Sequence, residues 1–452
     1  MWPTGDVGPC SGPVASAGRS ERPSTPRWRD RIGRALAGCG YDRVVLGRDG
    51  RETGAVLADA LAAGARGCGT TVCRHGRVAT PTLARSVSWQ DADAGVVVTA
   101  SHNPPPDNGF KFWTPSGMAF DEARRDGLEA AIDRDDGTTA AWDDVGGTAR
   151  VGDATARHRA AVCDAVAPVD DLSVVVDVGN GAGGVTVDAL RALGATVETL
   201  NAEVDGRFPA RPSEPTAATC GSLCAHVAAT DADLGVAHDG DADRTMAVDE
   251  TGRFVGGDEL LALFAVAALD GGDGSRVAVP VDTSLLVADA VADAGGTTER
   301  TPVGDVFVAE AARAGDVVFG GEPSGAWIWP DETLCPDGPL AACRLASVVD
   351  ARGPLSALLD RFDAYPIRRT SVETGAKTAV MRRVSERVHA AHDDVSTLDG
   401  VRVDHGDGWV LIRASGTQPL VRITAEARDD SRADDLLAAA AATVEAALDG
   451  ED

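Results

Sequence analysis

Lysine is almost absent from this sequence. Its 452 residues include two lysines, Lys111 and Lys377, and acidic residues outnumber lysine and arginine by 70 to 42, for a net charge of −28. Because nucleic-acid binding requires a basic face, we expect no nucleic-acid partner. An acidic surface with few lysines is typical of adaptation to a high-salt cytoplasm, where ions screen repulsion between like charges. A GC-rich gene that favours arginine codons is an alternative explanation, and neither explanation bears on the fold.

Long hydrophobic runs and paired cysteine motifs are also missing. No stretch reaches the roughly 18 apolar residues that a bilayer span requires, and the start carries no charged-then-apolar signal segment. We therefore expect a soluble, cytoplasmic protein without a membrane partner. The nine cysteines are scattered, with no Cys-x-x-Cys pair and no matching histidines. This pattern predicts reduced thiols in a reducing compartment.

Residues 1–27 lack any apolar periodicity. They are rich in proline, glycine, serine and arginine, which predicts a loop or disorder. From Trp28 onward, predicted helices and strands alternate, which indicates parallel sheets with right-handed crossovers. The last hundred residues differ, because residues 401–426 read as antiparallel strands and residues 431–448 as a helix. The length suggests three or four domains, joined by linkers near 134–150, 249–258 and 350–365.

A short buried strand at residues 95–98 runs into the loop Thr99-Ala100-Ser101-His102-Asn103-Pro104. A serine at the carboxyl end of such a strand lies where α/β sheets carry their chemistry. Lys111, on the next predicted strand, reaches the same rim of the sheet. The loop is either a proline-stiffened turn with a capping serine or the site of a nucleophilic or phosphorylated serine.

Three carboxylates alternate along the segment His238-Asp239-Gly240-Asp241-Ala242-Asp243-Arg244. In an extended loop they point to one side and converge on a hard cation such as Mg²⁺. Arg244 beside them suits a site that also holds a phosphate. A calcium-binding helix–loop–helix is rejected, because its sixth position requires glycine and Arg244 stands there. A solvated acidic turn remains an alternative.

The segment from Gly179 to Gly184 matches the dinucleotide-binding pattern G-x-G-x-x-G. It lies between a predicted strand and a helix, and Glu198 follows about 20 residues later. Read alone, it predicts an NAD-dependent oxidoreductase. Against this reading, the unit lies in mid-chain, Glu198 falls within the next strand, and no other segment suggests dehydrogenase chemistry.

Two further loops carry groups that suit a sugar phosphate. In Gly320-Gly321-Glu322-Pro323-Ser324-Gly325, Glu322 and Ser324 suit vicinal hydroxyls. In Arg413-Ala414-Ser415-Gly416-Thr417-Gln418-Pro419, a guanidinium, two hydroxyls and exposed amides suit a phosphate dianion. Each loop by itself is also consistent with an ordinary polar turn.

Together, the four loops resemble those of the α-D-phosphohexomutases, which include phosphomannomutases, phosphoglucomutases and phosphoglucosamine mutases. T-A-S-H-N-P is similar to the family's phosphoserine loop, D-G-D-A-D-R to its metal loop, G-E-P-S-G to its sugar loop and R-A-S-G-T-Q-P to its phosphate loop. The glycine-rich turn is similar to a turn in the family's second domain, which disfavours the oxidoreductase. The resemblance extends from about residue 28 to the C-terminus.

The resemblance implies an α/β fold with three similar mixed-sheet α/β domains plus a C-terminal α+β domain around a central active-site cleft. The expected domains are 1–148 with the phosphoserine loop, 149–250 with the metal loop, 251–362 with the sugar loop and 363–452 with the phosphate loop. The implied activity interconverts hexose 6-phosphates and hexose 1-phosphates through a phosphoserine and a bisphosphorylated sugar. Hexose phosphates are then the partners, in a monomer or a dimer.

The resemblance also implies the roles of individual residues. Ser101 carries the phosphoryl group, Lys111 assists as a general acid or base, and His102 shapes the loop. One Mg²⁺ per chain and a hexose 1,6-bisphosphate activator are expected. The implied Mg²⁺ ligands are Ser101, Asp239, Asp241 and Asp243. The implied substrate-binding residues are Arg244, Glu322, Ser324, Arg413, Ser415, Gly416 and Thr417.

The sequence departs from the family pattern at three places. A G-T-S-G-x-R-G-like stretch, whose arginine reaches the family's active site, is absent from residues 1–27. The alternative hypothesis that the chain is a sugar-phosphate-binding pseudoenzyme therefore stays open. Ala326 stands where many members carry histidine, and Gln418 where glutamate is common. The abrupt loss of periodicity before Trp28 predicts a non-native segment, caused by a shifted reading frame or a sequencing error, that does not pack as a strand. The segment G-E-P-S-G-A-W-I and the following C-P-D-G are most similar to archaeal phosphoglucosamine mutases.

Overall fold

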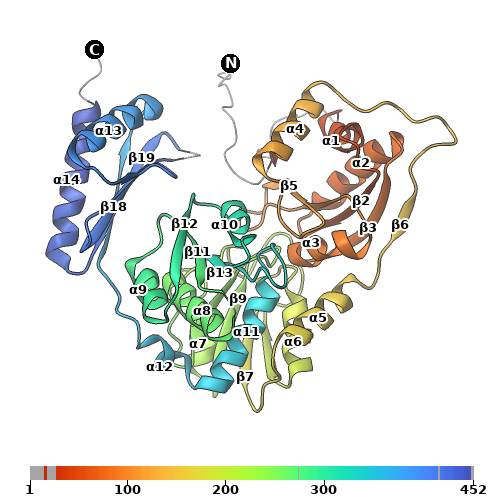
Figure 1. Ribbon diagram of the computed structural model, residues 1–452. Helices are drawn as coiled ribbons and strands as arrows, with labels where there is room; N and C mark the ends of the chain where they lie inside the picture. Colours follow the sequence, from red (N-terminus) through yellow and green to blue (C-terminus); the bar gives the residue numbers. More distant parts are fainter. Residues whose placement is uncertain (1–14, 18–26, 273, 416–417, 449–452) are drawn as a thin grey trace. The chain divides into compact units, whose positions relative to one another are not determined.

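The computed structural model describes residues 15–17, 27–272, 274–415 and 418–448 (Figure 1). The chain divides into two compact units, which are described separately. The larger unit contains the described residues up to Leu260 and residues 324–359. The smaller unit contains residues 261–323 and the described residues from Asp360 onward.

The larger unit begins with a six-stranded sheet in the order β1-β5-β4-β2-β3-β6. Its strands are β1 (Ala15–Ala17), β2 (Arg43–Arg48), β3 (Thr71–Arg77), β4 (Ala94–Val98), β5 (Asn108–Trp113) and β6 (Thr148–Arg150). Strands β2, β3, β4 and β6 pair in parallel, whereas β5 is antiparallel to β4 and β1 to β5. The sheet is therefore mixed. The expected alternation of strands and helices holds as far as β4, which is followed directly by the antiparallel strand β5.

Helices cover both faces of this sheet (Figure 1). They are α1 (Arg27–Gly38), α2 (Gly54–Gly67), α3 (Thr80–Trp89) and α4 (Glu122–Asp133). Helices α1, α2 and α4 pack together over one core, in which Ile32, Leu61 and Phe110 are fully buried beside Val96 of β4. The apolar residues at helical spacing in α1 and α2 thus form the face that meets the sheet.

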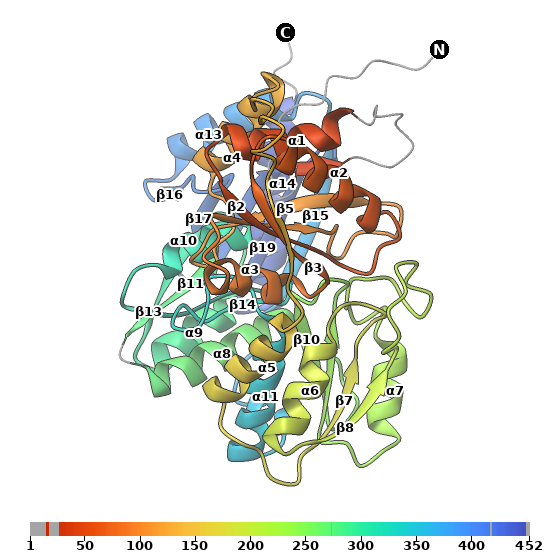
Figure 2. The ribbon, with the colours of Figure 1, turned by 90° about the vertical axis from the view of Figure 1, so that its right-hand side faces the viewer.

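A four-stranded sheet in the order β10-β9-β7-β8 follows. Its strands are β7 (Ser173–Asp177), β8 (Thr196–Leu200), β9 (Leu234–His238) and β10 (Thr245–Asp249), and only β10 pairs antiparallel. Its helices are α5 (Ala154–Ala165), α6 (Gly184–Leu193) and α7 (Gly221–Ala228). Figure 2 shows β7 and β8 between α6 and α7. From residues 324–359 come β14 (Ala326–Ile328), α11 (Gly338–Arg352), which packs on α6, and α12 (Leu355–Leu359).

The smaller unit contains three strands that pair in parallel and a separate antiparallel sheet. The parallel strands are β11 (Arg276–Pro280), β12 (Thr297–Thr301) and β13 (Val317–Glu322), with β11 in the middle. Their helices are α8 (Gly257–Gly271), α9 (Leu285–Asp293) and α10 (Asp305–Ala312). The residues of α8 up to Leu260 belong to the larger unit.

The antiparallel sheet has the order β15-β19-β18-β17-β16 and carries two helices over a valine- and alanine-rich core. Its elements are β15 (Ile367–Glu373), β16 (Val395–Ser396), β17 (Val401–Asp404), β18 (Gly408–Ala414), β19 (Leu420–Ala427), α13 (Lys377–Ala391) and α14 (Asp430–Leu448). The predicted fold class, three mixed-sheet α/β domains followed by an α+β domain, is confirmed.

Two local expectations are wrong. Residues 15–17 form β1 and pair with residues 108–110 of β5, so part of the segment before Trp28 does pack as a strand. Strand pairing uses backbone groups, and the edge of β5 offers them whatever the side-chain periodicity. The rest of that segment lies outside the described residues. The expected linker at 350–365 contains helix α12, whose Leu355, Leu358 and Leu359 are buried.

None of the helices in the described part of the chain has the length and hydropathy of a membrane span.

Candidate active site

Ser101 lies in a constrained loop at the carboxyl end of β4. Its backbone φ is +47°, in the left-handed region, which costs roughly 1–2 kcal/mol for a residue other than glycine. Its carbonyl accepts hydrogen bonds from Arg51 and Ser213, each at 2.8 Å. Its hydroxyl donates to Asp239 Oδ2 at 2.6 Å. The surrounding contacts thus hold the strained backbone so that the hydroxyl faces the carboxylates.

Arg51 organises this loop, and sequence reasoning missed it. The guanidinium is buried and forms an ion pair with Asp49 at 3.0 Å. It also donates to three further loop carbonyls, those of Asn103, Pro104 and Asp107, at 2.7–2.9 Å. Burial raises the pKa of Asp49 to about 6, against the lowering effect of Arg51. The signal was available, because Arg51 follows β2, the parallel neighbour of β4.

The three predicted metal ligands converge beside Ser101. The carboxylates of Asp239, Asp241 and Asp243 are all buried, and they offer ligand atoms within 4.8 Å of one another. The loop that carries them is a tight turn between β9 and β10, in which Ala242 has a φ of +58°. The predicted convergence is correct, but the expectation of an extended loop is wrong.

Three neighbouring elements clamp this turn. At the start of α3, the Thr80 amide donates to the Asp241 carbonyl at 2.9 Å and the Thr80 hydroxyl donates to Asp241 Oδ2 at 2.6 Å. On another side, a Cβ at Gly181 would lie 2.8 Å from the Gly240 carbonyl oxygen. At the start of α11, a Cβ at Gly338 would lie 2.6 Å from the Ala242 carbonyl oxygen. Backbone approaches this close fix the positions of the carboxylates.

Lys111 supplies positive charge to the cluster. Its ammonium lies 2.5 Å from Asp243 and 3.3 Å from Asp241. Burial opposes ionisation of Asp241, but Lys111 and the Thr80 hydroxyl outweigh it and lower the Asp241 pKa. Burial and the neighbouring carboxylates raise the pKa of Asp239 and of Asp243. Full ionisation of the three carboxylates is therefore disfavoured unless a further positive charge is present.

These residues fit a hard divalent cation. Carboxylate and hydroxyl oxygens are the ligands that Mg²⁺ prefers. Within the described residues, Asp241 Oδ1 is buried without a hydrogen-bond partner. A buried, unpartnered carboxylate oxygen among raised-pKa neighbours is the arrangement that a bound cation would satisfy.

His102 and Arg244 lie at the rim of this site. Burial, followed by the positive charges of Arg244 and Lys111, lowers the pKa of His102 to about 3, so its ring is neutral at pH 7. The Arg244 amide donates to Asp239 Oδ1 at 3.2 Å, and its guanidinium lies 3.4 Å from Glu214.

The G-x-G-x-x-G match is structural. The Ala182 amide donates to the Gly240 carbonyl at 3.0 Å, and a Cβ at Gly183 would lie 2.9 Å from the His238 ring. The turn thus packs directly on the metal loop, on the backbone that would face a pyrophosphate in a dinucleotide site. The oxidoreductase reading is not supported.

The sugar and phosphate loops are described in their own units. In the smaller unit, Glu322 Oε1 accepts from the Gly304 amide at 2.8 Å. The neighbouring Val303 amide donates to Asp399 Oδ2 at 3.2 Å, and the same oxygen accepts from Arg413 at 2.7 Å. A chain of contacts thus connects the two predicted ligand-binding loops through Asp399, which sequence reasoning did not identify.

The phosphate loop is partly described. Ser415 is buried, and its carbonyl accepts a 2.7 Å hydrogen bond from Lys377, the second lysine of the chain. Gly416 and Thr417 lie outside the described residues. In the larger unit, Ser324 is exposed, and the carbonyl of Gly325 accepts from the Thr245 amide at 2.9 Å.

Comparison with known families identifies the chain. Four family models match it in succession: phosphoglucomutase/phosphomannomutase domain I at residues 19–138, domain II at 157–252, domain III at 256–365 and the C-terminal domain at 369–443. The chain belongs to the phosphoglucomutase/phosphomannomutase family. The predicted family is therefore confirmed, and membership supports a hexose phosphate mutase, which is an isomerase.

Individual relatives agree with this assignment. A protein of Methanopyrus kandleri named "Probable phosphoglucosamine mutase" is 46% identical over 420 residues, covering 91% of this chain and 92% of its own. A protein of the same name from Methanocella arvoryzae is 42% identical, and the match covers 94% of this chain and 95% of its own. The crystal structure of a phosphoglucomutase/phosphomannomutase family protein from Burkholderia thailandensis, 28% identical, superposes with a TM-score of 0.86 over 98% of each chain.

Proposed function

We propose that this phosphohexomutase interconverts glucosamine 6-phosphate and glucosamine 1-phosphate through a phosphorylated Ser101. The observation that carries the proposal is the 2.6 Å hydrogen bond from the Ser101 hydroxyl to the buried carboxylate cluster. A nucleophile beside a cation site is the arrangement that phosphoryl transfer requires. The choice of sugar rests on the names of relatives that are 42–46% identical.

In the first half-reaction, the phosphorylated Ser101 donates its phosphoryl group to a hydroxyl of the sugar monophosphate. The bond between phosphorus and Ser101 Oγ breaks as the bond to the sugar oxygen forms. Lys111 donates a proton to Oγ and regains one from the attacking hydroxyl, so the proton balance closes. The bisphosphorylated sugar then reorients and returns its other phosphoryl group to Ser101 by the reverse steps.

Asp239, Asp241, Asp243 and an oxygen on Ser101 would hold one Mg²⁺, which, when bound, neutralises charge on the transferring group. The left-handed backbone at Ser101, held by Arg51 and Ser213, keeps Oγ directed at this cluster. Neutral His102 shapes the loop beside it.

The remaining predicted residues bind the substrate. Glu322 and Ser324 hold sugar hydroxyls in either orientation of the sugar. Arg413 and Ser415, with Gly416 and Thr417, bind the phosphate that is not reacting, and Asp399 and Lys377 position that loop. Arg244, beside the metal loop, binds the reacting phosphate. We keep the domain boundaries at 250/251 and 362/363, but the expected boundary at 148/149 would cut β6, so we place the first boundary after Arg150.

The cellular setting follows the same proposal. Unpaired cysteines in the described chain and phosphorylated metabolites as substrates fit a cytoplasmic enzyme, and the acidic composition fits a high-salt cytoplasm. Light scattering in 2 M KCl would distinguish a monomer from a dimer.

A coupled mutase assay tests the function. The purified chain, in high salt with Mg²⁺ and a trace of hexose 1,6-bisphosphate, would receive glucosamine, mannose or glucose 6-phosphate. We expect turnover with all three and the highest kcat/KM for glucosamine 6-phosphate. Calorimetric binding without turnover would instead support a sugar-phosphate-binding pseudoenzyme. A higher kcat/KM for mannose or glucose would overturn the choice of sugar alone.

A further inference from the structure

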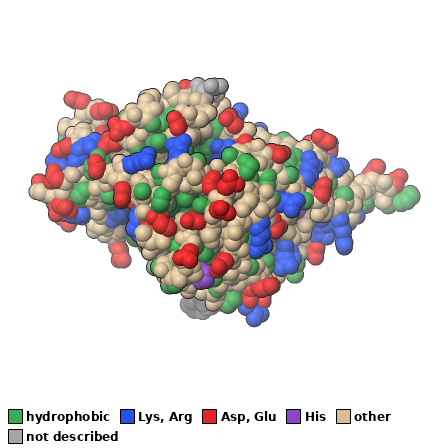
Figure 3. All heavy atoms as spheres, turned by 90° about the horizontal axis from the view of Figure 1, so that it is seen from below, with side chains coloured by type: hydrophobic (Ala, Val, Ile, Leu, Met, Phe, Trp, Pro, Cys, Tyr) green, Lys and Arg blue, Asp and Glu red, His purple; other side chains and the backbone are tan. Residues whose placement is uncertain are grey.

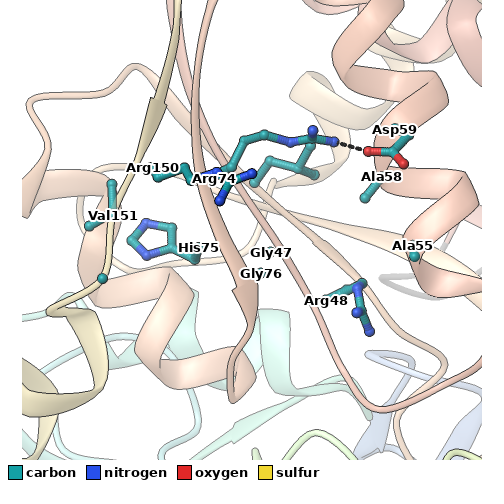
Figure 4. A pocket seen from close by; sticks show the side chains of 12 residues that line it. Gly47, Arg48, Ala55, Ala58, Asp59, Arg74, His75, Gly76, Arg150 and Val151 are labelled. Carbon is teal, nitrogen blue, oxygen red and sulfur yellow. Dashed lines mark hydrogen bonds and ion pairs between the residues drawn. The ribbon is translucent and has the colours of Figure 1, made fainter.

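A second hollow lies in the larger unit, on the first sheet. It has a volume of about 470 Å³, within the range of small-molecule sites, and is formed by β2, β3, α2 and the residues around the end of β6 (Figure 4). Ser101, Lys111 and the three aspartates are not among the described residues that line it. It is therefore separate from the proposed mutase site.

Positive charge gathers in this hollow. Arg48, Arg74 and Arg150 line it, and Asp59 is the acid among its described lining residues. This excess of positive charge is the reverse of the chain as a whole, which carries a net charge of −28. A local reversal of this kind marks a site where an anion is favoured.

Two of the arginines occupy adjacent positions. Arg74 of β3 pairs in register with Arg150 of β6, so the two side chains leave neighbouring strands on the same face. Figure 4 shows them next to each other. Like charges at paired positions are destabilising. Asp59 forms an ion pair with Arg74, which leaves the hollow with a net positive charge.

The third arginine approaches from β2. Arg48 donates to the Asp49 carbonyl at 3.0 Å, and burial, followed by the neighbouring charge of Arg77, lowers its pKa. Arg48 thus adds a third positive charge to the lining of the hollow.

His75 adds a neutral polar group. Between β2 and β3 the register shifts, so that Leu46 pairs with Arg74 and Gly47 with Gly76, and His75 is the extra residue of a bulge. Bulges near binding sites redirect side chains. Both ring nitrogens of His75 are buried without a hydrogen-bond partner within the described residues. Burial lowers its pKa to about 4, so the ring offers one donor and one acceptor at pH 7.

We propose that this hollow binds a small phosphorylated organic anion. The phosphate lies among Arg48, Arg74 and Arg150, because guanidinium groups match phosphate oxygens in pairs. The His75 ring hydrogen-bonds a hydroxyl of the ligand body, which satisfies nitrogens that otherwise stay unpaired. The apolar side of α2, at Ala55 and Ala58, contacts the rest of the ligand.

Calorimetry with glycerol 3-phosphate as the probe tests the proposal on the full-length protein. The Arg413→Gln variant removes the principal phosphate ligand of the mutase site. The heat of glycerol 3-phosphate binding that is still measured in this variant therefore comes from other sites. In that background we expect one binding event. Adding Arg74→Gln and Arg150→Gln should weaken it by at least about tenfold, because both guanidinium groups that form charge-assisted hydrogen bonds to the phosphate are removed. Adding Arg125→Gln, a half-buried arginine on α4 that is not among the described lining residues of the hollow, should leave it unchanged.

Two further measurements sharpen the result. Arg74→Gln/Arg150→Gln in the otherwise native protein should keep mutase turnover, because neither residue lies in the proposed mutase site. His75→Phe should weaken glycerol 3-phosphate more than inorganic phosphate, which has no carbon-borne hydroxyl. The proposal is overturned if the Arg413→Gln protein shows no binding event, or if the Arg74/Arg150 pair and Arg125 variants bind the probe equally. Either outcome leaves the mutase assay unaffected.

Discussion

Ser101 combines a strained backbone with a hydroxyl that is hydrogen-bonded to the buried carboxylate cluster. Its left-handed conformation persists because Arg51 and Ser213 hold its carbonyl. Arg51 also donates to three more carbonyls of the loop, so one buried guanidinium sets the position of the proposed nucleophile. The chemistry at this residue therefore depends on contacts that hold backbone atoms, whose removal would shift Oγ without deleting it.

Replacing Ser101 tests its role directly. Ser101→Ala should abolish phosphoryl transfer and leave the melting temperature nearly unchanged, because the hydroxyl lies in a loop outside the apolar core. The coupled assay measures the first effect and circular dichroism the second. Intact mass after incubation with hexose 1,6-bisphosphate should show an added phosphoryl group in the native protein and none in Ser101→Ala. Ser116→Ala, in an exposed turn, is the control, and a Ser101→Ala protein that keeps near-native turnover contradicts the assignment.

Metal removal tests the carboxylate cluster. Chelation should stop turnover, and Asp241→Asn should weaken Mg²⁺ binding in calorimetry, since it removes one of three converging charges. The loss in transition-state stabilisation should be several kcal/mol, the order that a Lewis-acid ion supplies. Asp188→Asn, an exposed aspartate on α6, is the matched control. Full activity after chelation would exclude the metal role.

At the scale of elements, Asp337 connects three helices of the larger unit. It caps the start of α11 by accepting from the Leu340 amide, and it accepts from Arg85 of α3 at 2.8 Å and contacts His158 of α5 at 3.0 Å. The carboxylate is fully buried. Burial opposes its ionisation, but His158 and Arg85 outweigh burial and lower the Asp337 pKa.

Asp337→Asn should destabilise the protein by about 3–5 kcal/mol at pH 7, because it leaves the buried Arg85 guanidinium without its counter-charge. A lowered folded-state pKa stabilises the fold above the unfolded value of about 3.9 and loses that effect as pH falls through the folded value. The difference between native and variant should therefore shrink in acid. Urea unfolding at pH 7 and pH 3 measures it. Asp121→Asn, at the half-buried N-cap of α4, should cost only about 1 kcal/mol, and an equal loss in both variants would contradict the ion-pair explanation.

The glycine-rich turn gives a second test at this scale. A Cβ at Gly181 would lie within 2.9 Å of two carbonyl oxygens of the metal loop, whereas a Cβ at Gly184 meets nothing within 4 Å. Gly181→Ala should lower stability by about 1–3 kcal/mol, as overpacking does, and should weaken Mg²⁺ binding. Gly184→Ala, in the first turn of α6, should be neutral or stabilising. Micromolar NAD binding by the native protein, lost in Gly181→Ala, would revive the dinucleotide reading.

The contrast between Gly181 and Gly184 shows which features of the site the sequence could predict and which it could not. Strand-ending motifs singled out Ser101 and the three aspartates, which the structure brings together. The same kind of motif is the basis of the proposed roles of Glu322 and Arg413. Arg51, Thr80, Asp337 and Asp399 were not found, since each acts on a loop far away in the sequence and no local pattern marks such a contact. Gly181 suggested the wrong ligand for the same reason: a close approach of backbone looks alike whether the neighbour is a phosphate or the carbonyl of another loop.

At the scale of the whole molecule, the charge predicts how stability depends on salt. Figure 3 shows acidic side chains spread over the visible face with basic ones between them, and the chain carries a net charge of −28. Repulsion of this size destabilises a compact state, and salt shortens its range from about 10 Å at 0.1 M to about 3 Å at 1 M. The melting temperature should therefore rise from 0.1 to 2 M KCl. A variant with Asp143→Asn, Asp144→Asn and Asp435→Asn, at exposed positions, should show a smaller rise. If the melting temperature is the same at both salt concentrations, repulsion is not limiting, and arginine-rich codon usage is the better explanation of the missing lysines.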